Sequence, residues 1–453
     1  MNKMMNEKKA FDPLRNILMF RVGEPVRLAM GIALALLFAL YALLGMGFAG
    51  KGPAVAVVAA GCAVLLILCT FRELEDQPVI VLLCTGLMYI LILSAHLAMM
   101  DIKSGRMANT LMPLLQSMWS YDLVTAMSWI DGSWSGGYLI LMGLLSRLET
   151  FPWLYAVKLI NLVGISFGAL AVQRLYRLNG GTQAGGVLAS GASMLALTVL
   201  LNSGTWTHCD AVFSALSLWG LYLLLKNHPW PGCLLWGLAV AFKLQAAFLF
   251  PLLIPMFMER KISLRHLAAL AAGFLVLHIP MFLDKQSLAS VLGRYSQQIT
   301  AMAYEGAGLS DNAPGVYGLM RIASVREFSG MGLFFGEAVA LILAMAMVRR
   351  GPLSTEQWIR CAILLAFGLP MILPQMNVRM HYLAFLLALT DARNLRGIAI
   401  AMLIELISLL GYMKGIFGSE VIPVLVLSLI SLALTVYMIT GCLARKEERN
   451  DVR

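Results

Sequence analysis

Strongly polar side chains are scarce in this sequence, and several of them stand inside or beside long apolar runs. Asp210 opens one such run, while Lys243 and Arg379 interrupt two others. An ionised group at the centre of a membrane helix costs about 3 kcal/mol on insertion scales, so such groups are candidates for function. A carboxylate can act as a general base, and Lys or Arg can bind an anionic group through charge-assisted hydrogen bonds. These three residues are therefore the first candidates for a site.

Further polar residues are expected on the same membrane face, in the predicted outer loops and at their ends. They are Asp101, Lys103, Arg106, Asn109, Trp206, His208, Gln245, Tyr295, Gln298, Asn312, Tyr317, Gln375, Asn377 and His381. Taken singly, each of these residues could lie at the membrane interface or cap a helix. Asp210, for example, could cap the helix that follows it. Lys243 and Arg379 could extend their charges to the interface. Because the set comes from distant parts of the chain, we favour a shared site.

The composition excludes a soluble enzyme. Of 453 residues, 60% are hydrophobic and only 13% are charged, whereas soluble proteins have about 25% charged residues. Apolar runs such as 31–49, 78–98 and 422–441 reach the roughly 20 residues that cross a hydrocarbon layer about 30 Å thick. The chain is predicted to be an all-α polytopic membrane protein.

The charges and the cysteines exclude two other classes of site. The net charge is +10, but the basic residues cluster between apolar runs rather than on one face, so a nucleic-acid partner is not expected. The seven Cys never form a CxxC pair, which argues against a zinc site and a disulfide framework. The spacing of His208 and His381 does not indicate a metal site, and we favour structural roles for both. Neither a cofactor nor a metal is predicted.

The order of apolar runs and basic loops predicts about 12–14 transmembrane helices. The predicted crossings are 27–48, 53–71, 78–99, 153–173, 186–203, 211–226, 266–284, 331–348, 360–374, 379–391, 396–414 and 422–441. The stretch 232–258 is too long for one straight crossing, yet basic residues flank both of its ends. We interpret it as two short helices that form a V, with Lys243, Leu244 and Gln245 at its apex near the outer side. Most Lys and Arg then lie inside, and both termini are cytoplasmic.

This topology divides the chain into a membrane domain and two short tails. Residues 1–26 and 442–453 form the cytoplasmic tails, and 27–441 form the transmembrane domain, in which 27–77 add two leading helices. The two long outer loops are 100–152 and 285–330. The first loop is rich in Trp and Tyr, so we expect it to form helices on the outer interface.

Four stretches of the sequence carry a family resemblance. Residues 203–254 contain W-x-x-x-D, from Trp206 to Asp210, and then K-L-Q-A from Lys243. Residues 294–318 contain Y-x-x-Q followed by N-A-P-G-x-Y. The third stretch is PQMNVRMHY at 374–382, and the fourth is SGRMANTLMP at 104–113. In order and spacing they resemble the GT-C class of integral-membrane glycosyltransferases, and within it the bacterial proteins similar to the GPI mannosyltransferase.

The resemblance implies a GT-C-like fold and transfer of a sugar, mannose among the candidates, from a polyprenyl-phosphate donor to an acceptor hydroxyl. The partners would be this lipid-linked sugar, membrane lipid and a glycan or lipid acceptor, at the outer face of a bacterial plasma membrane. The implied catalytic residues are Asp101 and Asp210. The implied substrate-binding residues are Arg106, Trp206, His208, Lys243, Gln245, Tyr295, Gln298, Asn312, Tyr317 and Arg379.

The sequence departs from the family pattern at the position of the expected base. Arg106 stands where the family has the first-loop acid, and Leu244 replaces the Pro of K-P-Q. Asp101 is the nearest substitute, but five residues on a helix turn by about 500°, so it would face elsewhere on a helix. A catalytically inactive relative that binds lipid phosphate or glycan as a partner subunit is therefore a second hypothesis. A transporter is a third, although it predicts broken helices in both halves and the sequence suggests only one V.

Overall fold

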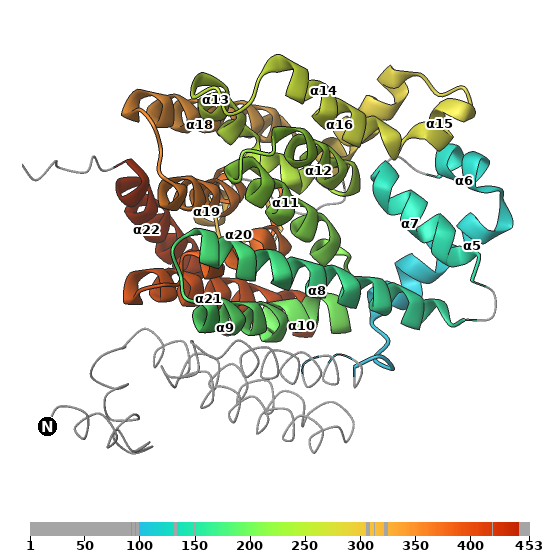
Figure 1. The fold of residues 1–453 in the computed structure, drawn as a ribbon. Coiled ribbons are helices and arrows are strands. Elements are labelled where there is room, and N and C mark those ends of the chain that lie inside the picture. The colour runs from blue at the N-terminus through green and yellow to red at the C-terminus, as the bar shows by residue number, and fades with distance from the viewer. Residues whose placement is uncertain are drawn as a thin grey trace, which may run out of the picture.

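The computed structural model describes Ile92, His96 and residues 99–130, 134–148, 151–304, 309–311, 313–320, 325–418 and 420–443. The predicted crossings 27–48 and 53–71, most of 78–99, and the two tails lie outside these residues, apart from Cys442 and Leu443. The described chain is a bundle of helices (Figure 1), with one parallel pairing between two-residue strands. The all-α prediction is confirmed.

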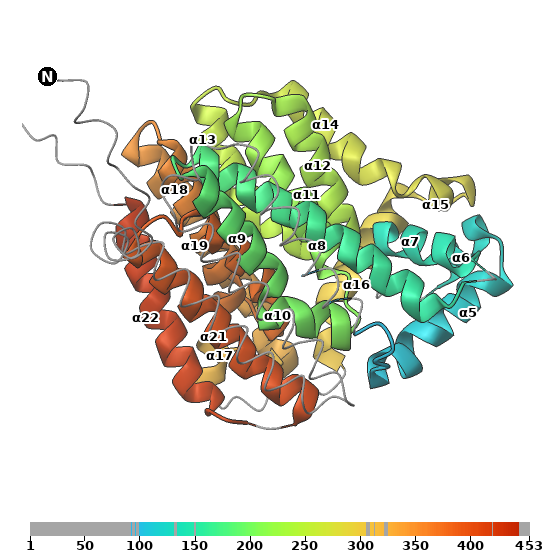
Figure 2. The ribbon, with the colours of Figure 1, turned by 60° about the horizontal axis from the view of Figure 1, so that its bottom comes forward.

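The first long loop is helical, as predicted. It forms η2 (Met107–Leu111), α5 (Met112–Ser120), α6 (Leu123–Trp129) and α7 (Gly136–Ser146). Asp122 caps α6, where its side chain accepts a hydrogen bond from the backbone N–H of Thr125 at 3.0 Å. These helices bury their own core, which includes Leu115, Met118 and Met127. They lie at one side of the molecule, away from α22 (Figure 2).

The central bundle begins with α8, which packs against α9 and α11. Its elements are α8 (Trp153–Leu178), α9 (Gln183–Leu195), α10 (Leu197–Leu200), η3 (Leu201–Thr205), α11 (Asp210–Leu225) and α12 (Pro229–Phe242). The predicted crossing 186–203 is bent by 44° between α9 and the helical run 197–205. The bend follows from Ala196, whose backbone is not helical.

The chain breaks at Lys243, where the sequence predicted the apex of a V. Lys243 is extended, with φ −159° and ψ 127°, and η4 (Leu244–Leu252), α13 (Leu253–Met258) and α14 (Leu264–Val276) follow. The rings of Trp230 and His266 lie 5.0 Å apart at the start of α12 and α14. At the other end, the Tyr295 hydroxyl contacts both the carbonyl of Ala241 and His278. The two helices therefore run parallel, which requires residues 243–263 to return to the end where α12 begins.

Glycines allow this close contact between α12 and α14. A Cβ atom at Gly237 would lie 2.0 Å from the carbonyl oxygen of Leu270, and one at Gly273 would lie 2.2 Å from that of Leu234. Small residues at such crossings let two backbones approach in membrane proteins.

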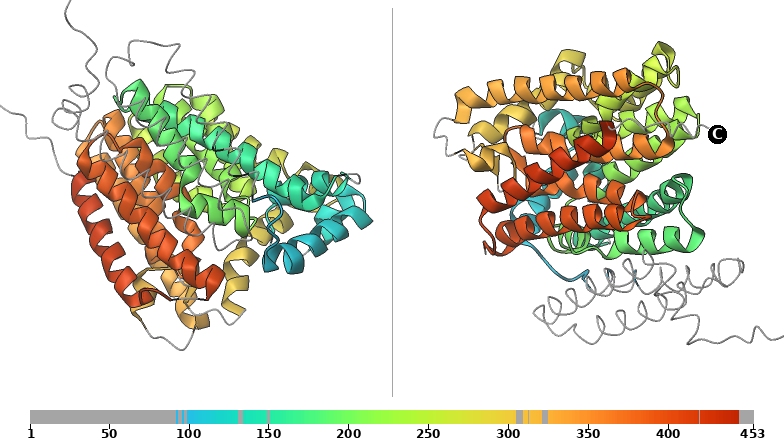
Figure 3. Two further views of the ribbon diagram at one scale, coloured as in Figure 1. Left: turned by 90° about the horizontal axis from the view of Figure 1, so that it is seen from below. Right: turned by 90° about the vertical axis from the view of Figure 1, so that its left-hand side faces the viewer.

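The remaining elements complete the bundle. They are α15 (Ile279–Leu283), α16 (Leu288–Tyr304), β1 (Ser310–Asp311), α17 (Val316–Leu319), α18 (Val325–Arg350), α19 (Thr355–Ile372), β2 (Met376–Asn377), η5 (Val378–His381), α20 (Tyr382–Thr390), α21 (Leu395–Phe417) and α22 (Val424–Leu443). All nine residues of α20 are buried, which agrees with its apolar sequence on every face. Figure 3 shows α18 and α22 on the outside of the bundle.

Four helices in the described part are long and apolar enough to cross a membrane, or five if the bent pair counts as one span. The four are Trp153–Leu178, Phe328–Arg350, Leu395–Ile416 and Val424–Cys442. A polytopic membrane protein is thus confirmed. The total of 12–14 crossings stays a prediction, because several of the predicted ones are shorter apolar helices here and others lie in the undescribed N-terminal part.

Polar contacts join the loops that the distribution of basic residues predicts on the inner side of the membrane. Arg360 pairs with Asp391 at 2.9 Å, and Asn179 donates a hydrogen bond to the same carboxylate. Glu259 accepts a hydrogen bond from the backbone N–H of Leu353 at 2.9 Å. Four of the predicted inner loops therefore meet at one end of the bundle, opposite the polar groups described next.

Candidate functional site

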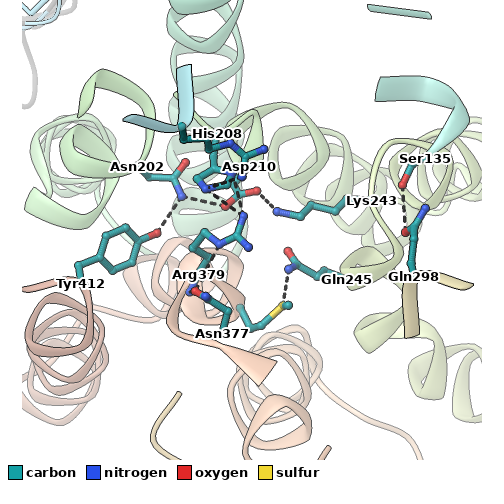
Figure 4. Close-up of polar contacts among 12 residues, drawn as sticks. Ser135, Asn202, His208, Asp210, Lys243, Gln245, Gln298, Asn377, Arg379 and Tyr412 are labelled. Atoms are coloured by element: carbon teal, nitrogen blue, oxygen red, sulfur yellow. Dashed lines mark hydrogen bonds and ion pairs between the residues drawn. The ribbon is translucent and has the colours of Figure 1, made fainter. Parts of the chain in front are cut away.

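A cluster of charged side chains lies where α11, the break at Lys243, and η5 converge (Figure 4). Lys243 forms an ion pair with Asp210, whose carboxylate is 1% exposed, whereas the Lys243 side chain is 25% exposed. Lys243 reaches this point because the break ends α12 with an extended residue instead of another turn. A buried carboxylate needs such a partner, since an isolated charge is costly away from water.

Asp210 is held by a second contact that the sequence prediction missed. Its Oδ2 accepts a hydrogen bond from Nδ2 of Asn202 at 2.8 Å, and the same Nδ2 lies 2.7 Å from the hydroxyl of Tyr412. Asn202 belongs to η3 and Tyr412 to α21. Both stand in apolar runs of the sequence, so the rule that selected Lys243, a polar group at membrane depth, could have selected them too.

His208 lies between two guanidinium groups. Arg106 Nη1 is 2.9 Å from its Nε2, and Arg379 Nη1 is 2.8 Å from its Nδ1 and 3.0 Å from its Nε2. Burial, and the positive charges of Arg379, Arg106 and Lys243, hold the pKa of His208 well below its ordinary value. The imidazole is therefore neutral, and a neutral imidazole has a single acceptor nitrogen. The two arginines cannot both be satisfied by it.

Arg106 and Arg379 bring positive charge that no carboxylate of the described chain neutralises by direct contact. The Nε of Arg106 is buried without a hydrogen-bond partner. Arg379 is held by Asn377, whose side-chain oxygen lies 3.3 Å from the Arg379 Nε, and its guanidinium lies 5.7 Å from the ring of Trp206. The arrangement leaves several guanidinium N–H groups available to an anion.

The backbone beside the cluster adopts unusual conformations. Thr207, a buried β-branched residue between Trp206 and His208, has φ +57°, and Gln375 has φ +59°. Left-handed conformations of β-branched residues cost energy and concentrate at functional sites. Here they present the side chains on both sides of Thr207 to the cluster: the ring of Trp206 lies 5.2 Å from that of His208.

The structure therefore brings together most of the predicted site residues. Those that meet in the cluster are Arg106, Trp206, His208, Asp210, Lys243 and Arg379. Gln245 lies beside it and contacts the sulfur of Met380. The pairing of Ser310–Asp311 with Met376–Asn377 also brings the second outer loop next to the late motif.

Four predicted residues have other contacts. Asp101 is exposed and accepts a hydrogen bond from the hydroxyl of Tyr155 at 2.7 Å. Tyr295 bonds to Ala241 and His278, as described above, and Gln298 accepts a hydrogen bond from Ser135, apart from the cluster (Figure 4). The hydroxyl of Tyr317 faces Gly332 of α18. Asn312 lies outside the described residues.

Lys158 is a further residue that the sequence prediction missed. It is buried in α8, and its ammonium group donates hydrogen bonds to the carbonyl oxygens of Met99 at 2.7 Å and Ile102 at 2.5 Å. These bonds fix the start of the first loop against the bundle, a few residues before Arg106. The described residues contain no group of His, Cys, Asp and Glu that could hold a metal ion.

Comparison with known proteins agrees with the sequence resemblance. The family model described as alpha-(1->6)-mannopyranosyltransferase, N-terminal domain, matches residues 140–259. The matched segment includes Trp206, His208, Asp210 and Lys243, while Arg106 and Arg379 lie outside it. No curated protein matches the chain. The resemblance to GT-C-type mannosyltransferases is confirmed over this segment.

Proposed function

We propose that the protein is a glycosyltransferase that moves a sugar from a polyprenyl-phosphate donor to an acceptor hydroxyl at the outer face of a bacterial plasma membrane. The observation that carries this proposal is the cluster in which Lys243 pairs with the buried carboxylate of Asp210, while Arg106 and Arg379 contact the neighbouring His208. Mannose is the sugar that the family match favours. The basic inner loops support cytoplasmic termini.

The reaction needs an anion clamp and a base. The acceptor oxygen forms a bond to the anomeric carbon while the bond from that carbon to the phosphate oxygen breaks, with inversion. The hydroxyl proton passes to a carboxylate, and the electron pair leaves with the polyprenyl phosphate. Cationic groups that are already in place stabilise the charge that develops on the leaving phosphate, and this lowers the barrier. Arg379 and Lys243 suit that role because both side chains are partly exposed.

Asp210 is our candidate for the base. Both of its oxygens are engaged, one by Lys243 and the other by Asn202. A donor phosphate beside Lys243 would compete with Asp210 for the ammonium group and so release one carboxylate oxygen for the acceptor hydroxyl. Asp101 remains the first-loop alternative; it is exposed and accepts a hydrogen bond from the hydroxyl of Tyr155.

The test is transfer of labelled sugar from polyprenyl-phosphate donors by the purified full-length protein in bilayers. The wild-type protein should consume donor. Asp210→Asn should lower the turnover about a hundredfold or more, since a general base contributes that much. Asp122→Asn is the matched control, because Asp122 caps a helix in the first loop, and it should retain activity. Loss of turnover in Asp101→Asn with activity kept in Asp210→Asn would move the base to the first loop.

A binding subunit without catalysis is the second candidate, and Arg106 is the observation that favours it. A guanidinium occupies the cluster where the family resemblance expects the acid. In this case no donor is consumed by any variant, while the lipid phosphate still binds.

A further inference from the structure

The charges of the cluster do not match those of a sugar donor. Arg106, Lys243 and Arg379 carry three positive charges and Asp210 one negative charge, which leaves a net charge of plus two. His208 adds none, because it is neutral. Tyr138, beside Arg106, adds none either, since burial raises the pKa of its phenol.

The two lipid species in the proposed reaction differ by about one charge. A polyprenyl-phosphate sugar is a phosphodiester and carries one negative charge. The lipid that leaves is a phosphate monoester, and such groups carry about −1.5 to −2 at pH 7. A site with a net charge of plus two is matched by the second species, whereas the first would leave one positive charge of the site without a counter-charge.

The extra charge comes from Arg106. Lys243 is paired with Asp210, so these two charges offset each other at short range. Arg379 then supplies one unpaired positive charge and Arg106 the other. The buried, unpartnered Nε of Arg106 is a donor that still lacks an acceptor, and a buried donor without an acceptor costs about 1–3 kcal/mol. A phosphate oxygen within reach would remove that cost.

We propose that the cluster is selective for a polyprenyl phosphate monoester over a polyprenyl phosphodiester, and that Arg106 is the residue that determines this specificity. The inference rests on the proposed function only in taking a lipid phosphate as the ligand. In an active transferase, the site would bind the leaving phosphate more tightly as its negative charge develops, and it would hold the polyprenyl phosphate product after transfer. In a binding subunit the monoester is the cargo.

The test measures binding without turnover. The probes are a polyprenyl phosphate and its methyl phosphodiester, titrated at pH 7 against the full-length protein in nanodiscs. The wild-type protein should bind the monoester at least about tenfold more tightly than the diester, because the monoester forms one more charge-assisted contact with the site. Arg106→Gln should reduce this preference to below about threefold, mainly by weakening the monoester complex. Arg106→Lys should retain most of it, since it keeps the charge.

Lys103→Gln is the matched control, because Lys103 is an exposed cation three residues before Arg106, and its preference should equal that of the wild-type protein. Equal affinities of the wild-type protein for both probes would overturn the inference. So would an Arg106→Gln variant that weakens both complexes by the same factor. Neither result depends on sugar transfer. Transfer without the preference would contradict this inference alone, and the preference without transfer would contradict the proposed function alone.

Discussion

At the scale of residues, removing Lys243 would leave a buried carboxylate without its ion-pair partner, whereas removing Arg379 would not. Lys243 is the ion-pair partner of a carboxylate that is 1% exposed, whereas Arg379 contacts a neutral imidazole and the amide of Asn377. Residue type and apolar context predicted both as anion ligands. They could not predict that only one of them also compensates a buried charge, because that depends on the position of Asp210 in space.

This difference predicts the behaviour of a set of variants. Lys243→Met should destabilise the protein by about 3–5 kcal/mol, as breaking a buried pair does, and it should also weaken binding of polyprenyl phosphate. Adding Asp210→Asn should restore much of the stability without restoring binding. Arg379→Met should weaken binding with little loss of stability.

Thermal unfolding in detergent and titration with polyprenyl phosphate measure the two effects separately. If Lys243→Met unfolds at the wild-type temperature, the ion pair does not stabilise the fold. If both Met variants bind the lipid normally, these side chains only extend to the interface.

At the scale of elements, α21 holds the helical segment that carries the site. Glu405 is 2% exposed, and its carboxylate accepts hydrogen bonds from the backbone N–H of Thr198 at 3.0 Å and from its hydroxyl at 2.6 Å. Seven residues later on α21, Tyr412 contacts Asn202 of η3. Both contacts lie just after the bend at Ala196. The segment that leads to His208 and Asp210 is thus fixed from one helix.

The sequence predicted the helices of this region but not this connection. The apolar runs located α21 and the bent helical run from Gln183 to Thr205 within a few residues. Glu405 is an acid inside an apolar run of the sequence, yet nothing in the sequence identifies its partner, because the bend that exposes the N–H of Thr198 depends on packing. The break at Lys243 was predictable, since basic residues flank both ends of an apolar run too long for one crossing.

Replacing Glu405 should therefore affect the site at a distance. Glu405→Ala leaves the N–H and the hydroxyl of Thr198 without an acceptor, at a cost of about 1–3 kcal/mol for each buried group. Its unfolding temperature should fall, and its affinity for polyprenyl phosphate should fall with it. Glu337→Ala, which removes an exposed carboxylate from α18, should change neither. Normal lipid binding by a clearly destabilised Glu405→Ala protein would show that α21 does not position the site.

At the scale of the whole molecule, polar contacts gather at two opposite ends of an apolar bundle. One end joins the predicted inner loops through Asp391 and Glu259, and the other holds the cluster around Asp210. Charge distribution along the sequence predicted this division, because loops of like charge tend to share a membrane face. The convergence of first loop, η3 and η5 on one point could not be derived from periodicity. The topology predicted that these polar groups share one membrane face, and the family resemblance named candidate site residues, of which six meet in the cluster and four have other contacts.

The most direct test of the account is to map where a lipid phosphate binds. A polyprenyl phosphate with a photoreactive group next to the phosphate would be crosslinked to the full-length protein in nanodiscs, and the modified peptides identified by mass spectrometry. The account predicts modification within residues 99–111, 202–212 and 374–381, reduced by excess unlabelled polyprenyl phosphate and by Arg379→Met. Modification concentrated at the opposite end, around Arg360 and Arg396, and unchanged in Arg379→Met, would contradict it.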